Sequence, residues 1–237
     1  MTGFTEDCLL RMRRVTTATL TTQLFKRGLR NVFLRNVRPL GPYSGNMVGP
    51  AFTLRNIPAR EDIDVVEGFA NPDHPQRRAI ETVPPGHVLV VDCRGEVAAA
   101  SGGEILMTRL SMRGAAGMVS DGGIRDSAPI ARLPMPVYCA GPAAPLNLVA
   151  HHATELQVPI GCGGVAVYPG DLIVGDADGV VVVPAHLAEQ VAIDADAQEQ
   201  FETWALGRIQ AGAKLPGTYP PNADTRAAYE AWKQAQG

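Results

Sequence analysis

Lysine is scarce in this chain of 237 residues, with Lys26, Lys214 and Lys233 as its only three. Two of them, Lys214 and Lys233, stand in tail-like stretches near the C-terminus. Enzymes that form a Schiff base with their substrate need a desolvated lysine amine. The lysine content therefore disfavours covalent amine catalysis.

Long apolar runs and clusters of basic residues are also missing. No apolar run approaches 18 residues and the first 15 residues are polar and charged, so we expect neither a membrane span nor a signal peptide. The net charge is −3 and no stripe of arginine and lysine is present, which argues against a nucleic-acid partner. No Gly-x-Ser-x-Gly elbow or Cys–His signature is found, which disfavours nucleophilic hydrolysis.

The four cysteines and five histidines are dispersed and lack the spacing of a zinc site. We interpret the cysteines as reduced thiols and expect a cytoplasmic protein. Apolar residues make up 46% of the chain, enough for a sizeable core, and the length suits one domain.

Short strands alternate with helices along the chain, which predicts a mixed α/β domain. Helices are expected at 5–14, 17–27, 76–83, 104–113, 185–211 and 225–236. Strands are expected at 32–39, 47–57, 87–92, 117–120, 136–140, 165–168, 172–175 and 180–183. We assign residues 1–212 to a single domain and residues 213–237 to a C-terminal tail with a short helix, a segment that could pack on a neighbouring subunit.

The most informative stretch is 102–126, which we predict to form a loop, a helix, a strand and a second loop. Gly102 and Gly103 allow a tight turn. Glu104 stands in the first turn of the helix that follows, where its negative charge interacts favourably with the positive end of the helix dipole. Ile105, Leu106, Leu110 and Met112 are expected to share one side of that helix, which ends at Gly114. The loop after the strand presents Arg125 and Asp126 at a carboxyl end, where open α/β folds commonly bind ligands.

The chemistry suggested by this stretch is a metal ion together with an anion. Glu104 and Asp126 are hard oxygen ligands suited to Mg²⁺ or Mn²⁺. Free amides of residues 103–106 can hold a carboxylate or phosphate, and Arg125 can bind a carboxylate with two hydrogen bonds or stabilise an enolate. A purely structural interpretation stays open, in which the glycines make a turn, Glu104 caps the helix and Arg125 and Asp126 pair with surface charges.

Other polar residues are weaker candidates. His151 and His152 are adjacent, so their side chains should point in different directions and cannot share one metal. Asp92 follows a buried strand and could orient the site, although a role in a turn is the safer interpretation. Charged residues at 60–62 fit a solvated loop better than an active site.

The pattern of the central stretch resembles the signature of the RraA-like family. It reads Gly-Gly-Glu-Ile-Leu from Gly102, then Arg-Gly-x-x-Gly from Arg113, then Val-x-Asp-Gly-x-x-Arg-Asp ending at Asp126. The resemblance covers nearly the whole chain, including 16–40, 49–64, 84–92 and 178–184. The family includes metal-dependent 4-hydroxy-4-methyl-2-oxoglutarate / 4-carboxy-4-hydroxy-2-oxoadipate aldolases and a regulator of ribonuclease E.

The resemblance implies a layered β/β/α fold of the swivelling-domain type, assembled as a homotrimer or homohexamer with sites between subunits. It implies that Glu104 and Asp126 organise the metal and that Arg125 contacts the substrate. It also implies a further acid from the C-terminal helix of a neighbouring subunit. Glu202 matches best, and Glu199 is the reserve.

Together these observations predict a metal-dependent lyase that cleaves a 4-hydroxy-2-oxo acid to pyruvate through an enolate, with oxaloacetate decarboxylation as related chemistry. Arg125, Glu104 and Asp126 are the expected catalytic residues. Gly103, Glu104, Ile105, Leu106 and Arg125 are the expected substrate-binding residues. We expect the far end of the substrate to be read by the 60–75 loop or by another subunit. The alternative is a non-enzymatic regulator of ribonuclease activity that binds a protein partner.

Overall fold

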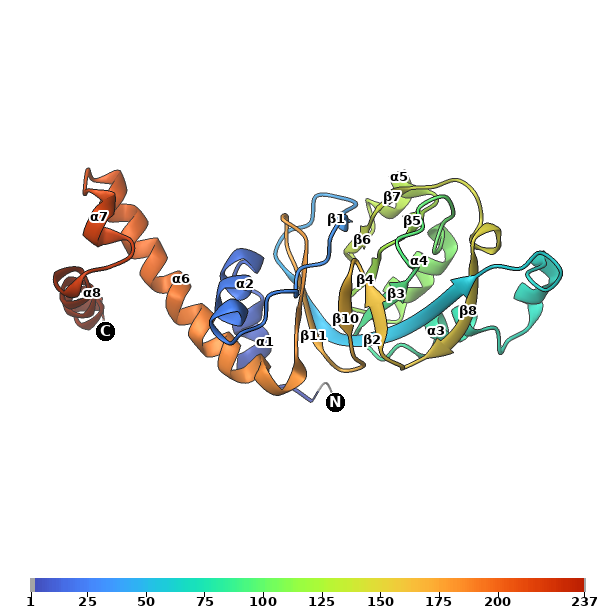
Figure 1. Cartoon of the computed structure of the whole chain (residues 1–237), viewed down its shortest axis with the longest axis horizontal. Coiled ribbons are helices and arrows are strands. Elements are labelled where there is room, and N and C mark those ends of the chain that lie inside the picture. Colours follow the sequence, from blue (N-terminus) through green and yellow to red (C-terminus); the bar gives the residue numbers. More distant parts are fainter. Residues whose placement is uncertain (1–2, 237) are drawn as a thin grey trace.

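The chain forms a layered body with a long helical arm on one side (Figure 1). The computed structural model describes residues 3–236. Within this range, no helix is both long enough and apolar enough to cross a membrane.

The main sheet of the body is mixed and is centred on the long strand β2 (Met47–Pro58). β2 pairs in parallel with β3 (Val88–Asp92), which pairs in parallel with β4 (Gly117–Ser120), and β4 pairs in parallel with β6 (Val137–Cys139). Antiparallel strands complete the sheet. β8 (His151–Leu156) and β11 (Leu172–Gly175) pair with β2, β12 (Val180–Val183) pairs with β11, and β1 (Arg38–Pro39) pairs with β6. Two small sheets join β5 (Gly123–Ile124) to β7 (Gly141–Pro142) and β9 (Ile160–Cys162) to β10 (Val165–Val167).

Three helices lie in the connections between the parallel strands, because a parallel crossover needs a long connecting segment: α3 (Pro75–Thr82), α4 (Glu104–Met112) and α5 (Ser127–Ile130). The other helices are α1 (Glu6–Met12), α2 (Thr17–Lys26), α6 (Ala188–Gln210), α7 (Leu215–Thr218) and α8 (Ala223–Gln236). Short 3₁₀ segments are η1 (Val66–Ala70), η2 (Asn147–Val149) and η3 (Ala185–Leu187).

Three hydrophobic clusters form the core. One packs Ala79 of α3 and Leu110 of α4 against the parallel strands. A second fills the space between strands, with Val90 of β3 facing residues such as Val165 of β10. A third packs α1, α2 and α6 on β11 and β12. The α/β class and the predicted β/β/α layering, with helical extensions at both ends, are confirmed.

The N-terminal helices are tied to α6 by side-chain caps. Thr16 caps α2 by accepting a hydrogen bond from the Thr19 amide at 3.2 Å. Glu199 of α6 in turn accepts hydrogen bonds from the Thr16 amide at 2.9 Å and the Thr16 hydroxyl at 2.7 Å. Burial alone would raise the pKa of Glu199, but hydrogen bonds from Thr16 and Thr19 outweigh it and lower the pKa.

We expect Glu199→Gln to lower the free energy of unfolding at pH 7 by about 1 kcal/mol, since a charge-assisted cap is weakened. Because the folded pKa lies below the ordinary value of 4.5, the carboxylate contributes its full stability above that pH. The contribution disappears as pH falls through the folded pKa. Urea unfolding of both proteins at several pH values checks this, and a difference that grows on acidification would contradict it. Exposed Glu230 of α8, changed to glutamine, is the control.

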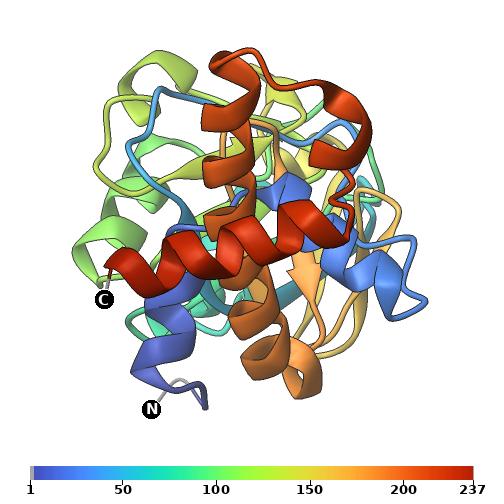
Figure 2. The same cartoon turned by 90° about the vertical axis from the view of Figure 1, so that its left-hand side faces the viewer.

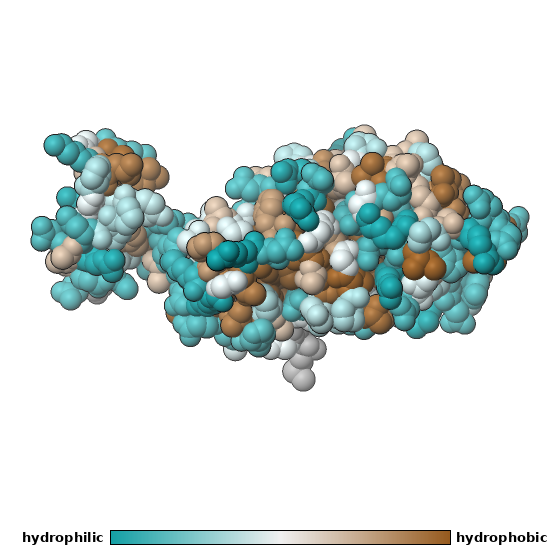
Figure 3. Space-filling view, in the orientation of Figure 1, coloured by the Kyte–Doolittle hydropathy of each residue, from teal (hydrophilic) through white to brown (hydrophobic). Residues whose placement is uncertain are grey.

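The arm consists of the outer half of α6 with α7 and α8. Tyr229 of α8 packs on Phe201 and Trp204 of α6, with ring centroids 5.2 and 5.4 Å apart. Figure 2 views the molecule from the arm end, where α8 crosses in front of α6. Figure 3 shows a hydrophobic area at the tip of the arm. Leu206 of α6 and Leu215 of α7 are exposed apolar residues. The division at residue 212 stays a prediction.

Two sequence expectations were wrong. A strand at 32–39 is reduced to β1 and an isolated bridge at Phe33, because Asn36 adopts a left-handed conformation with φ 60° that interrupts an extended run. The apolar face of α4 was also misassigned. Leu110 is fully buried, but Ile105 is 84% exposed and Met112 is 79% exposed. Met107, which the expected face left out, is buried instead.

Candidate active site

The site is organised around the first turn of α4 and the loop that follows β4. Asp126 has a left-handed backbone, with φ 55° and ψ 39°. Its Oδ2 atom accepts a hydrogen bond from the Glu104 amide at 3.1 Å and lies 3.5 Å from Arg125 Nε. A side chain from a different loop therefore caps α4, whose own N-cap residue Gly103 has no side chain to do so.

Gly103 is required by this close approach. A Cβ at this position would lie 2.8 Å from Asp126 Oδ2 and 2.9 Å from Arg125 Cγ. Both distances are below those found for real side chains. The glycine therefore allows the two charged residues to pack directly against the helix start.

The loop that carries Arg125 and Asp126 is fixed from beneath by a buried carboxylate. Asp121 accepts hydrogen bonds from the amides of Cys93 at 2.7 Å, Gly95 at 3.0 Å and Gly163 at 3.1 Å. The Arg125 amide donates to the Gly102 carbonyl at 3.1 Å, which joins the two loops directly. The backbone of the site is thus held in place before any ligand binds.

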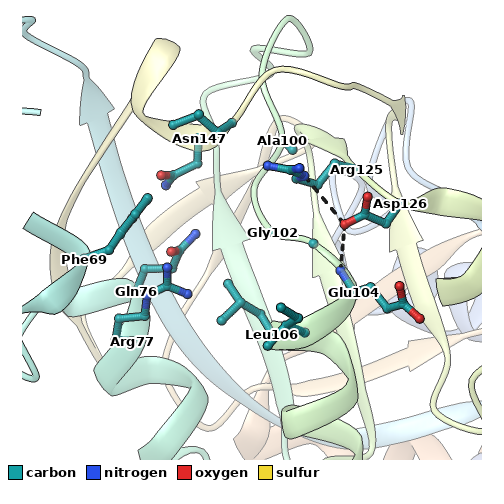
Figure 4. A pocket seen from close by; sticks show the side chains of 13 residues that line it. Phe69, Gln76, Arg77, Ala100, Gly102, Glu104, Leu106, Arg125, Asp126 and Asn147 are labelled. Carbon is teal, nitrogen blue, oxygen red and sulfur yellow. Dashed lines mark hydrogen bonds and ion pairs between the residues drawn. The ribbon is translucent and has the colours of Figure 1, made fainter. Parts of the chain in front are cut away.

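A cavity of about 240 Å³ opens beside these residues (Figure 4). Arg125, Asp126 and Glu104 lie on one side of it, whereas Phe69, Gln76 and Arg77 lie on the other. Further lining residues include Gly102, Gly103, Ile105, Leu106 and Asn147. The structure therefore brings together the predicted residues of the 102–126 stretch around one space.

The predicted anion-binding amides are correctly placed at the start of a helix. The amides of Ile105 and Leu106 belong to the first turn of α4, where an α-helix offers no internal acceptor. They lie at the positive end of the helix dipole. This end of the cavity suits a carboxylate.

Six lining residues were not predicted from the sequence: Phe69, Gln76, Arg77, Ala100, Leu146 and Asn147. Phe69 lies in the 60–75 loop, where we expected contacts to the far end of a substrate. Gln76 and Arg77 belong to the first turn of α3, which has no motif of its own. No local pattern marked them, since their position depends on how α3 packs beside α4.

Glu202 and Glu199 lie away from this cavity within one chain. Glu202 accepts hydrogen bonds from Gln198 Nε2 at 2.8 Å and from the Tyr219 hydroxyl at 2.7 Å, on the arm (Figure 1). Glu199 is engaged by Thr16. Either residue could reach Asp126 only from a neighbouring subunit, so their assignment stays a prediction.

The remaining candidates have structural roles. His151 is buried beside the Ala99 carbonyl, and burial lowers its pKa, whereas His152 Nδ1 lies 2.6 Å from Asp64. Arg60 Nε pairs with Asp62 at 2.6 Å on the surface, as expected for a solvated loop. Asp92 Oδ1 accepts the Arg94 amide at 2.8 Å, which supports its interpretation as a turn residue.

The four cysteines form no disulfide in the part of the chain that the structure describes. Cys8, Cys93, Cys139 and Cys162 are all free and buried. Burial raises the pKa of Cys8 to about 11 and of Cys93 to about 12, so both remain thiols at neutral pH. They take no part in the site.

By its fold the chain is a layered β/β/α protein. A helix start, an arginine and two carboxylates meet at its cavity. The chain belongs to the RraA-like family, described as Aldolase/RraA, whose match covers residues 17–182.

Three proteins similar to this chain match most of its length. The chain is 33% identical to the "Putative 4-hydroxy-4-methyl-2-oxoglutarate aldolase" of Halalkalibacterium halodurans over 188 residues, 78% of this chain and 80% of the relative. A crystal structure of an uncharacterized protein from Pseudomonas syringae pv. tomato superposes with a TM-score of 0.78 at 27% identity, covering 91% of this chain and 98% of that one. Streptomyces coelicolor RraAS2, described as an unusual member of the RNase ES inhibitor RraA protein family, superposes with a TM-score of 0.75 at 32% identity, covering 85% and 96%.

Proposed function

We propose that this protein is a divalent-metal-dependent carbon–carbon lyase that cleaves a 4-hydroxy-2-oxo acid to pyruvate and a second oxo acid. The observation that carries the proposal is the meeting of Asp126, Arg125 and the first turn of α4 at one end of a cavity. The aldolase name of the Halalkalibacterium halodurans relative supports this reaction class.

The donor set suits Mg²⁺ or Mn²⁺. Asp126 uses Oδ2 for the Glu104 amide, and no hydrogen bond or ion pair within residues 3–236 engages its Oδ1 or the Glu104 carboxylate. Mg²⁺ commonly keeps several waters and binds proteins through one or two carboxylates together with its substrate. When bound here, the metal would supply Lewis-acid stabilisation of developing negative charge.

The chain's own residues account for the other requirements. Within residues 103–106 the Glu104 amide is taken by Asp126, and the amides of Gly103, Ile105 and Leu106 hold the 2-oxo acid carboxylate at the helix start. The Glu104 carboxylate takes the proton of the C4 hydroxyl through a bound water. The C3–C4 bond then breaks, its electron pair moves to the C2 oxygen, and the Arg125 guanidinium stabilises the resulting pyruvate enolate. Return of the proton from Glu104 through the water to C3 gives pyruvate. Loss of CO₂ from oxaloacetate passes through the same enolate.

We further propose a homotrimer or homohexamer with sites between subunits, which accepts small oxo acids and no nucleic acid. Ile105, which lines the cavity, and Met112, at the other end of α4, are exposed apolar residues and support a subunit contact along this helix. Such an arrangement would allow the arm of a neighbour to bring Glu202 to the site.

The test is pyruvate release from oxaloacetate and from 4-hydroxy-4-methyl-2-oxoglutarate. We expect turnover with Mg²⁺ or Mn²⁺ that is lost with EDTA and restored by added metal. No turnover of either substrate by folded, assembled protein would contradict the proposal.

A second candidate is a regulator of ribonuclease activity, favoured by the likeness to the Streptomyces coelicolor protein of the RNase ES inhibitor family. That function does not require the acids Glu104 and Asp126. Inhibition of a purified ribonuclease E-type enzyme, unchanged by Asp126→Asn and without lyase activity, would favour it.

A further inference from the structure

The wall opposite Arg125 and Asp126 is built from residues with no role in the enolate chemistry. Phe69 of η1 and Gln76 and Arg77 of α3 form this wall in Figure 4, and Asn147 closes the cavity at its upper side in the same view. A substrate whose 2-oxo acid end lies at α4 would extend its other end toward these groups.

Arg77 carries a positive charge that lacks a partner within residues 3–236. No carboxylate lies within 4.0 Å of its guanidinium, and no hydrogen bond engages it. Its guanidinium carbon lies 4.3 Å from the centroid of the Phe69 ring, which fixes its plane. Burial lowers the pKa of Arg77, so the cation has lost hydration without gaining an anion.

Two buried carbonyl oxygens beside Arg77 also lack a partner in the described structure. Gln76 is 4% exposed. Its Nε2 donates a hydrogen bond to the Ser101 carbonyl at 2.8 Å, whereas its Oε1 accepts none. Asn147 is 6% exposed and its Oδ1 has no donor either. A buried acceptor left unpaired costs about 1–3 kcal/mol. Both residues line the cavity, but the two oxygens are themselves covered by neighbouring atoms, so Arg77 is the group of this wall with which a ligand carboxylate can pair.

We propose that Arg77 binds a second carboxylate of the substrate and makes the enzyme select dicarboxylic over monocarboxylic 2-oxo acids. The effect of Arg77 on catalysis rests on the proposed function, but binding of a dicarboxylic acid can be measured without cleavage.

Binding is therefore measured first, with two acids of five carbons that lack a scissile aldol bond. Titration calorimetry with the full-length assembled protein compares 2-oxoglutarate with 2-oxopentanoate. We expect the wild type to prefer the dicarboxylate by about 10- to 100-fold, the range for hydrogen bonds to a charged group. Arg77→Gln should remove this preference while leaving 2-oxopentanoate binding within about twofold.

Turnover provides the second measurement, with 4-hydroxy-4-methyl-2-oxoglutarate and the monocarboxylate 4-hydroxy-2-oxopentanoate. Arg77→Gln should raise KM for the dicarboxylate, with kcat little changed, and Arg77→Lys should restore part of the loss. Arg78→Gln is the matched control, because Arg78 is the next residue on α3 and is exposed outside the cavity.

The outcomes separate the two proposals. A preference for 2-oxoglutarate that depends on Arg77, without any cleavage, would keep the subsite and reject the lyase. Equal weakening of both acids, no effect of Arg77→Gln, or no binding of either acid by the wild type would overturn the subsite. Loss of the oligomer in Arg77→Gln would also overturn the subsite, because it would show that the guanidinium stabilises a subunit contact.

Discussion

Asp126→Asn is expected to lower kcat for pyruvate release by at least about 10²–10³-fold, the loss typical when one electrostatic partner of a developing charge is removed. Asparagine keeps the side-chain shape, adopts the left-handed backbone that position 126 requires, and can still accept the Glu104 amide hydrogen bond. The change thus removes charge and a metal ligand with little effect on the fold.

The measurement is steady-state turnover of oxaloacetate over a range of Mg²⁺ and Mn²⁺ concentrations, together with the melting temperature. Asp178→Asn is the matched control, because Asp178 is an exposed aspartate in the turn between β11 and β12, outside the cavity. Full activity of Asp126→Asn would show that the site assignment is wrong. A large drop in melting temperature would instead show that Asp126 stabilises the fold.

Gly103→Ala should be nearly as damaging to activity, although it adds only one methyl group. The new Cβ would lie 2.8 Å from Asp126 Oδ2 and 2.9 Å from Arg125 Cγ, so both side chains must move. A displacement of about 1 Å in a catalytic group can cost about 10²-fold in rate. Because both residues lie at the open surface of the cavity, we expect most of the loss to appear in activity and little in the melting temperature.

The control is Gly161→Ala on β9, where an added Cβ meets nothing within 4 Å. Both variants are compared for turnover and melting temperature. If Gly103→Ala retained wild-type activity, the close packing of Arg125 and Asp126 on the helix start would not matter for catalysis. A crystal structure of the variant would then show where the methyl group is accommodated.

Local patterns predicted most of the regular structure because each signal was strong over its own few residues. In the strand Val88–Asp92 the four apolar residues are buried, as expected for a central parallel strand, and only Asp92 at its end is partly exposed. Gly114 ends α4 with φ 79°, as a glycine after a helix commonly does. The error at 32–39 also has a local origin: asparagine adopts the left-handed conformation more readily than most residues, and the prediction treated Asn36 as part of an extended run.

The face of α4 shows where a pattern is insufficient. Apolar residues occur on more than one side of this helix, so periodicity could not decide which side is buried. The structure buries Met107 and Leu110 and exposes Ile105 and Met112. The exposed pair suits a contact with a second subunit, which the pattern of a single chain does not distinguish from a core.

What the sequence by itself determined is the end of the cavity that holds the proposed catalytic residues. Gly103, Glu104, Arg125 and Asp126 stand within 25 residues of one another, and a helix followed by one strand is enough to bring them together. What only the tertiary structure decided is the opposite wall. Arg77 and Asn147 are separated from this stretch along the chain and become its neighbours only because α3 packs beside α4 and the chain returns before β8. Such long-range contacts depend on the packing of whole layers, and no spacing of residues within one segment encodes them.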